Sequence, residues 1–230
     1  MSTKILVWHF RSADGTTEYL RTPETVGETY RVTGPIEPCR TGLHGSVRAI
    51  DVLEYAPGPL VCRVEHGGEI VHHADGTKLA SSERRLLWTA DATKALRLFA
   101  CWSAERALLR ERKAGREPDS RSWNAIAVAR LFAEGKASIQ DLAAAWAAAR
   151  AAAWDAAWDA THLATAGAAA RAAAGAAAGA AARAAAWDAA RAAARDAAGA
   201  AEREIQNAKL EEMLLALEPK KKPTKKRRSK

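Results

Sequence analysis

The stretch LVCRVEHGGEIVHHADG, residues 60–76, decides the fold of the N-terminal part of this chain. Residues 60–65 largely alternate between apolar and polar side chains, which is typical of a β-strand with one buried face. We predict that this strand pairs with a second strand over residues 69–73 across His66-Gly67-Gly68, because glycines here favour a hairpin turn. Asp75-Gly76 marks the next turn.

Similar signals surround this stretch on its N-terminal side. Residues 4–10 and 29–33 have the composition of strands, and the sequence from 46 to 55 places apolar residues at helical spacing. Glycine and proline separate these segments. Residues 1–88 are therefore predicted to form a small α+β domain.

Beyond residue 88 the apolar spacing becomes 3.6 residues, which indicates helices. One helix is expected to end near Gly115, and the next to follow Pro118-Asp119-Ser120. Ser138 and Asp141 resemble a capping box at the start of a third helix. The predicted fold class is α+β, in this order: an N-terminal mixed sheet domain over 1–88, a helical segment over 89–137, a long alanine-rich helical region over 138–203, an amphipathic helix over 204–218 and a disordered basic tail over 219–230.

The alanine-rich region has a period of four. Between residues 141 and 200, 37 of 60 residues are alanine, and nearly every fourth residue is Trp, Arg or Gly. A period of four advances about 400° on a helix, so these residues wind around it and form no single face. We interpret the region as a duplicated repeat whose helicity matters more than its side chains. We also expect Trp146, Trp154 and Trp158 to pack on the preceding helices and Trp187 to be exposed.

The positive charge is concentrated at the C-terminus. The formal net charge is +8, and the C-terminal run alone contains eight basic residues and no acidic one. They are Lys220, Lys221, Lys222, Lys225, Lys226, Arg227, Arg228 and Lys230. Such a run neutralises phosphates by counterion release, so we predict weak, non-specific contact with nucleic acid. It contains no aromatic residue that would stack on bases. The alternative is a tail that only improves solubility.

A compact apolar stripe precedes this tail. Leu210, Met213, Leu214 and Leu217 follow the i, i+3, i+4, i+7 spacing of an amphipathic helix. The stripe either returns to the core of the same chain or joins two copies of it. We predict that it is a self-association surface of a homo-oligomer.

Metal and cofactor sites are not predicted. Cys39, His44, Cys62 and His66 are residue types that bind zinc, but their spacing fits no common zinc finger. The odd number of cysteines, three, favours a reducing compartment, and the cytoplasm is the expected location. No targeting segment or membrane span is expected. No serine hydrolase series or phosphate loop is present, so a protein without enzymatic activity is favoured.

The segment Cys39-Arg40-Thr41-Gly42-Leu43-His44, followed by a short helix ending at Tyr55 and the strand after Pro57, resembles an uncharacterised domain common at the N-terminus of phage-encoded proteins. The likeness covers about residues 3–88. Low-complexity C-terminal repeats are frequent in that family. The resemblance implies a phage or prophage accessory protein that binds a macromolecular partner.

Two weaker resemblances give further hypotheses. Residues 87–147 are similar to the helical part of immunity proteins from actinobacterial toxin systems, which bind and occlude a protein partner. The layout of Gly42-Leu43-His44-x-Ser46, the helix to Tyr55 and the strand over residues 60–65 is similar to the middle of ADP-ribosyltransferase folds, where such a unit lines the nicotinamide pocket. That second resemblance implies an enzyme as the alternative function, with His9, Arg11 and Glu83 as the available candidate residues.

Overall fold

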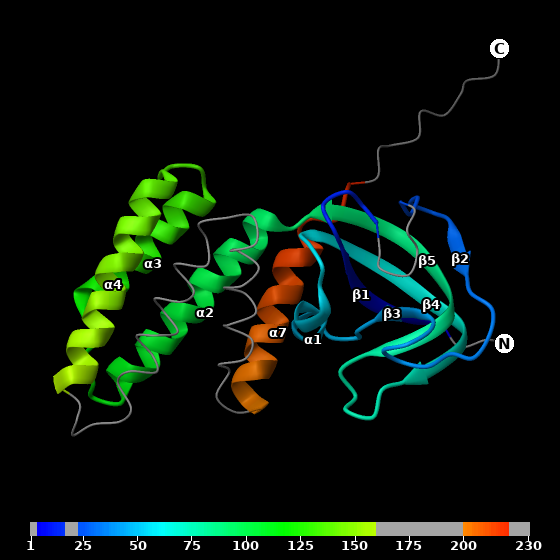
Figure 1. The fold of residues 1–230 in the computed structure, drawn as a ribbon, viewed down its shortest axis with the longest axis horizontal. Helices are drawn as coiled ribbons and strands as arrows, with labels where there is room; N and C mark the ends of the chain where they lie inside the picture. Colours follow the sequence, from blue (N-terminus) through cyan, green and yellow to red (C-terminus); the bar gives the residue numbers. More distant parts are fainter. Residues whose placement is uncertain (1–3, 17–22, 160–199, 221–230) are drawn as a thin grey trace, which may run out of the picture.

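The computed structural model describes residues 4–16, 23–159 and 200–220. A five-stranded antiparallel sheet forms the N-terminal part, and most of the helices follow it in the chain (Figure 1). The predicted α+β class is confirmed. Within the described residues, no helix is both long enough and apolar enough to cross a membrane.

The sheet curls until it closes on itself. Its strands are β1 (Ile5–Arg11), β2 (Thr29–Arg31), β3 (Leu43–Gly45), β4 (Leu60–His72) and β5 (Leu79–Asp91). β4 pairs with β1 on one side and with β5 on the other, and the far edge of β5 pairs with β2 and β3. Directly after β3, Ser46 bridges Trp8 of β1 through two backbone hydrogen bonds of 2.8 and 3.0 Å. The domain is therefore a small barrel.

Closure depends on a glycine in β3. A Cβ atom at Gly45 would lie 2.7 Å from Cγ2 of Val7 and 3.1 Å from the carbonyl oxygen of Trp8. Real side chains do not approach so closely, so β3 and β1 meet here only because residue 45 has no side chain.

The predicted hairpin at His66-Gly67-Gly68 is wrong. β4 runs through these residues without turning, and its register against β5 shifts between Gly67 and Ile70. Gly68, with φ of 68°, forms part of a β-bulge there. The turn lies further on, at the predicted Asp75-Gly76, where the His73 N–H donates to the Lys78 carbonyl oxygen at 2.9 Å. Adjacent glycines suit a bulge as well as a turn, and the long partner strand β5 selects the bulge.

Alternation along the strands gives the barrel two different faces. The inner face carries an apolar cluster of Val7, Cys62, Val64, Leu79 and Leu86. The outer face carries Trp8, Phe10, Val61 and Trp88, which pack against helices. Such a two-sided burial pattern requires cover on the outside, and the helices provide it.

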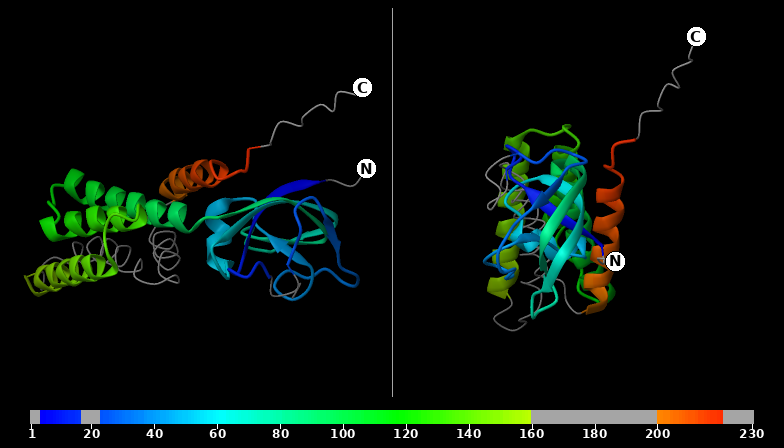
Figure 2. Two further views of the ribbon diagram at one scale, coloured as in Figure 1. Left: turned by 90° about the horizontal axis from the view of Figure 1, so that it is seen from above. Right: turned by 90° about the vertical axis from the view of Figure 1, so that its right-hand side faces the viewer.

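The helical part of the chain is arranged around α2, which contributes to two separate cores. They are α1 (Ala49–Val52), which continues as a 3-10 turn over Leu53–Tyr55, α2 (Thr93–Lys113), α3 (Ser120–Ala133), α4 (Ile139–Asp159) and α7 (Ala200–Leu215). The first half of α2 contributes Leu96 and Phe99 to the core shared with the barrel, and its second half contributes Ala104 and Leu108 to a core with α3 and α4. α4 and α7 lie on opposite sides of α2 (Figure 2).

Both predicted helix starts are present. The Asp119 side chain accepts a hydrogen bond from the Arg121 N–H at 2.7 Å and caps α3. Before α4, the Ser138 N–H donates to the Asp141 carboxylate at 2.8 Å, and the Asp141 N–H donates to the Ser138 hydroxyl at 3.1 Å. This reciprocal pair is the predicted capping box.

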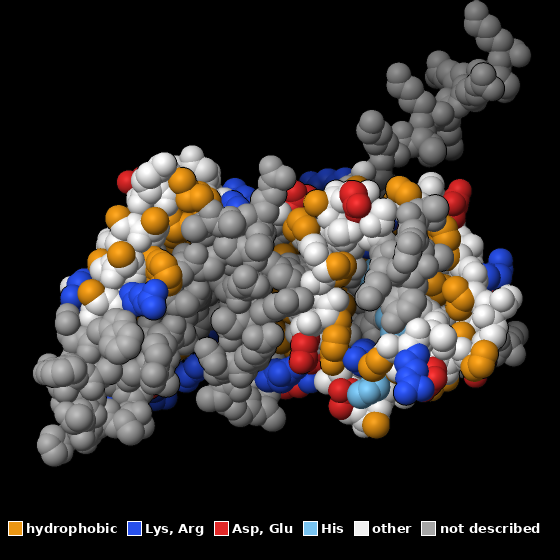
Figure 3. Space-filling model, in the orientation of Figure 1, with side chains coloured by type: hydrophobic (Ala, Val, Ile, Leu, Met, Phe, Trp, Pro, Cys, Tyr) orange, Lys and Arg blue, Asp and Glu red, His pale blue; other side chains and the backbone are white. Residues whose placement is uncertain are grey.

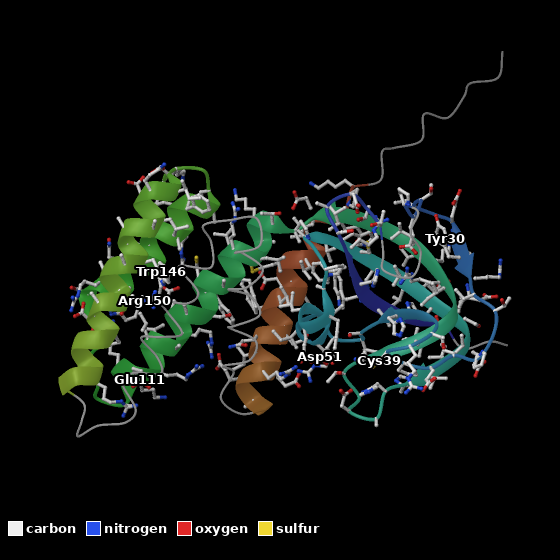
Figure 4. The ribbon with its side chains drawn as sticks, viewed as in Figure 1. Tyr30, Cys39, Asp51, Glu111, Trp146 and Arg150 are labelled. Atoms are coloured by element: carbon white, nitrogen blue, oxygen red, sulfur yellow. The ribbon has the colours of Figure 1, made fainter. Side chains whose placement is uncertain are left out.

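The prediction for Trp146 is confirmed in part, because this side chain packs against the core of α2, α3 and α4. It is only half-buried there, beside the Arg150 guanidinium (Figure 4), and the fully buried face of α4 consists of Leu142, Ala145, Ala149 and Ala152. Alanines allow close approach of helices, and an indole on the same line would hold them apart. The side chains of Trp154 and Trp158, and all of Trp187, lie outside the described residues.

The leucine stripe of α7 packs within the chain. Leu210 and Leu214 have no exposed surface and belong to the core that contains Trp8, Leu53 and Phe99. Met213 and Leu217 are partly buried against the same core. The predicted self-association surface is therefore covered by its own chain. The barrel's outer face and α2 offer an apolar surface that the helical pattern of α7 alone could not reveal.

Candidate functional site

A cavity of about 290 Å³ lies beside the inner face of the barrel. β1, the segment before β3, β3 itself, α1 with its 3-10 turn, and β5 all contribute to its walls. Its lining includes seven side chains with polar or ionisable groups, namely His9, Cys39, His44, Ser46, Tyr55, Lys78 and Arg84, and no aspartate or glutamate.

Two buried arginines lie beside this cavity, and one of them is paired with a carboxylate. Arg84 is 2% exposed and donates to the Glu24 carboxylate at 2.5 and 3.1 Å, and to the His44 carbonyl oxygen at 3.2 Å. Arg11 is 3% exposed and donates to the carbonyl oxygens of Gly15 and Glu24. Among the described carboxylates, Glu24 alone forms an ion pair with either guanidinium. The barrel interior therefore holds one positive charge in excess.

Three histidines stand near these charges in the neutral form. The pKa values of His9 and His66 are well below the ordinary value, and that of His44 is lowered to about 4. Burial is the largest cause in each case, and the positive charge of Arg84 is the next. At neutral pH each imidazole therefore offers one N–H donor and one acceptor nitrogen.

Two polar atoms of the cavity wall have no hydrogen-bond partner among the described residues. They are His9 Nε2 and Ser46 Oγ, and both lie out of contact with solvent. Buried polar atoms in proteins nearly always have a partner. These atoms are therefore positions at which a molecule in the cavity gains hydrogen bonds.

The segment before β3 shapes one side of the cavity. Cys39 is the single described non-glycine residue with positive φ, at 73°, and it lies at the edge of the barrel (Figure 4). Its backbone N–H donates to His44 Nε2 at 3.0 Å. Since Nε2 accepts, the neutral His44 ring carries its proton on Nδ1.

Lys78 contributes a cation to the same wall. Its ammonium lies 3.8 Å from the centroid of the Tyr55 ring, and no described carboxylate forms an ion pair with it. Partial burial lowers the pKa of Lys78, but contacts with Cys39 and Tyr55 outweigh this effect and the pKa is raised. The lysine therefore stays charged.

The C-terminal helix holds α1 in place. α1 has no side-chain cap of its own. Instead, Asn207 of α7 accepts a hydrogen bond from the Ile50 N–H at 3.0 Å, and Glu211 accepts from the Ala49 N–H at 3.4 Å and from the Trp8 indole at 3.3 Å. α7 thus supplies the N-terminal cap of an element that lines the cavity.

The four zinc-type residues are not brought together as a metal site. Cys39 is exposed at the barrel edge, whereas Cys62 is buried and contacts the Thr89 hydroxyl. His66 shares a hydrogen bond of 2.9 Å with Ser81. In the described part of the chain, no group of three histidine, cysteine or acidic side chains is arranged to hold a metal ion.

The three residues suggested by the ADP-ribosyltransferase likeness are also separated. His9 lines the cavity, but Arg11 is bonded to the loop that carries Gly15 and Glu24. Glu83 lies outside the cavity and forms a 2.8 Å ion pair with Arg31 on the surface. A catalytic carboxylate is therefore not placed at this site.

Of the predicted nucleic-acid-binding residues, Lys220 is described and is exposed. The other seven, Lys221, Lys222, Lys225, Lys226, Arg227, Arg228 and Lys230, lie outside the described residues. On the face of the molecule shown in Figure 3, the visible acidic and basic side chains are interspersed.

Residues 16–98 match a family model described as a domain of unknown function, DUF7666. The matched segment contains β2 to β5, α1 and the start of α2, and so includes most of the cavity wall. It does not include His9 or α7. Searches of curated proteins and of solved structures found no match.

Sequence reasoning missed three residues of this site, Glu24, Lys78 and Arg84, and noted Ser46 only as part of the ADP-ribosyltransferase-like layout. The sequence patterns predicted no strand over residues 79–91, so the position of Arg84, opposite His66 at the inner face of β5, emerged only from the structure. A charged residue at an inward position of a strand indicates either a buried ion pair or a site. Glu24 gave no signal, since its contact with Arg84 is long-range.

Proposed function

We propose that this protein is a binding protein whose barrel cavity holds a small polar molecule. The observation that carries the proposal is the pair of unpartnered buried atoms, His9 Nε2 and Ser46 Oγ, in the wall of a cavity of about 290 Å³. Concave sites with a few convergent polar groups are the usual binding sites for small molecules. The neutral histidines favour hydrogen bonding over proton transfer at neutral pH.

The wall chemistry favours binding over catalysis. No lining residue is a carboxylate, and the pKa values of His9 and His44 are too low for efficient general base chemistry near pH 7. The ADP-ribosyltransferase alternative needs a carboxylate, and Glu83 is engaged with Arg31 elsewhere. We therefore favour a protein without enzymatic activity. Automodification on addition of NAD would contradict this part of the proposal.

The basic run at the C-terminus is the basis of a second proposed binding activity, toward nucleic acid. We propose that residues 220–230 bind nucleic acid weakly and without sequence preference, since eight cations lie close together. The described body of the chain would then present its cavity to one ligand while a macromolecular partner is bound elsewhere. We further propose that the protein is an accessory protein of a phage or prophage, because the segment from Cys39 to His44 and the helix and strand after it resemble a domain of phage-encoded proteins.

A matched pair of serine variants tests the cavity. Ser46 and Ser103 both have buried hydroxyls without a described partner, but only Ser46 lines the cavity. We expect a metabolite panel to contain compounds that raise the melting temperature of the wild type. Ser46→Ala should reduce that shift and Ser103→Ala should preserve it. An equal response of the two variants would count against the cavity as the binding site.

A further inference from the structure

The cavity stands beside an unusual balance of buried charge. Arg11 and Arg84 are both almost fully buried, and among the described carboxylates only Glu24 forms an ion pair here, with Arg84, while Arg11 has backbone carbonyl acceptors. Burying a charge without a counter-charge is costly, because water no longer stabilises it. We infer that the ligand of the cavity is a compact oxyanion, a small carboxylate or phosphate, an inference that rests on the proposed binding function.

Two positively charged groups line the cavity. One is Arg84, whose charge is already paired with Glu24. Lys78 lines another part of the wall and has no described carboxylate beside it. An oxyanion between them meets two cations and no lining acid. Charge-assisted hydrogen bonds of this type are about twice as strong as neutral ones.

The uncharged polar groups of the wall also suit an oxyanion. Ser46 Oγ carries a hydroxyl proton that no described acceptor takes. The neutral form of His9 can place its N–H on Nε2, which is likewise unpartnered. Both groups can then donate to the same oxyanion. Carboxylates and phosphates have several acceptor oxygens and no need of an acceptor in the wall.

Size and shape limit the ligand. A volume of about 290 Å³ is at the small end of ligand cavities. The Lys78 ammonium lies over the ring of Tyr55, 3.8 Å from its centroid, so that face of the ring is not available for stacking a base. A small acid or phosphate ester fits these features better than a dinucleotide.

Titration calorimetry on the full chain at constant ionic strength tests the inference. The probes are inorganic phosphate, succinate and the uncharged sugar ribose. Lys78→Met removes one of the two cations that line the cavity, the one without a carboxylate partner, and Lys113→Met is the matched control, because Lys113 is exposed on α2 away from the cavity. We expect one anion per chain, with about tenfold or greater weakening in Lys78→Met and no change in the control.

The order of the affinities for the probes and the effects of the variants identify the ligand class. Tighter binding of phosphate than succinate assigns a phosphorylated ligand, and the reverse order assigns a carboxylate. Lys78→Arg should retain anion binding, which separates a loss of charge from a loss of folding. Equal anion binding by the wild type and Lys78→Met places the anion elsewhere, such as on the basic tail, and overturns the inference.

Ribose separates the inference from the proposed function. Binding of ribose that is as tight as anion binding, and is weakened by Ser46→Ala, would overturn the oxyanion inference and leave the binding function standing. If no probe binds and no metabolite of the wider panel responds to Ser46→Ala, both fail. Anion binding weakened by both Lys78→Met and Ser46→Ala supports both.

Discussion

Replacing Leu214 by alanine should lower the free energy of unfolding by about 3 kcal/mol. Leu214 has no exposed surface, and its side chain packs in the core formed by the barrel, α1, α2 and α7. Alanine there removes apolar contacts and leaves a cavity, and both effects favour the unfolded chain. The next residue, Leu215, is 48% exposed on the same helix, so Leu215→Ala should change stability by less than about 0.5 kcal/mol.

Urea denaturation followed by far-UV circular dichroism measures both variants. With a slope of about 2 kcal/mol per molar urea, the midpoint should fall by about 1.5 M in Leu214→Ala and by less than about 0.3 M in Leu215→Ala. Both shifts should be the same at two protein concentrations, because the contact lies within one chain. Equal losses in the two variants, or a midpoint that rises with protein concentration, would refute the assignment of Leu214 to the intramolecular core.

Three further predictions concern the barrel and the tail. The free energy of unfolding should fall as the pH drops from about 6.5 toward 4, because the pKa values of His44 and His66 are lowered in the folded chain and the unfolded chain therefore binds more protons in this range. The variant His66→Gln should flatten the dependence of the urea midpoint on pH. A profile that is unchanged in this variant would contradict the prediction. Gly45→Ala should destabilise the barrel by about 1 to 3 kcal/mol in thermal melts. Gly67→Ala should not, because a Cβ atom at residue 67 would have no neighbouring atom closer than 3.8 Å. Similar melting temperatures of the two variants would show that β3 can move to make room. Deletion of residues 219–230 should preserve the melting temperature and abolish binding to duplex DNA. For the full chain, the logarithm of the binding constant should fall with the logarithm of the salt concentration with a slope of about −5 to −7. A truncated chain that binds DNA with the same slope would disprove the prediction.

Local signals in the sequence predicted most of the elements. The cap at Asp119, the capping box at Ser138 and the helix end near Gly115 lie where the sequence placed them, because each depends on residues within one turn. The error at Gly67-Gly68 arose because a bulge and a turn use the same residue type. Only the pairing of β4 with β5 distinguishes the two.

The site was harder to predict because its contacts join distant segments. Arg84 meets Glu24 across 60 residues, and Asn207 caps Ile50 across 157. Hydrophobic patterning identified the buried side of α7 correctly, but a pattern specifies a buried face and not its partner. The assignment of that face to a second copy of the chain was wrong for this reason.

The docking of α7 also sets an order of events during synthesis. α1 and β1 are complete early in translation, but Asn207, Glu211 and Leu214, which cap and cover them, are made about 160 residues later. At ribosomal rates of about 5 to 20 residues per second, this interval lasts roughly 8 to 30 s. During it, α2 can pack on its part of the barrel's outer face, but the part that α7 covers, where the Trp8 indole donates to Glu211, stays uncovered. The nascent barrel therefore exposes an apolar surface to which chaperones can bind until α7, the last described helix, leaves the ribosome.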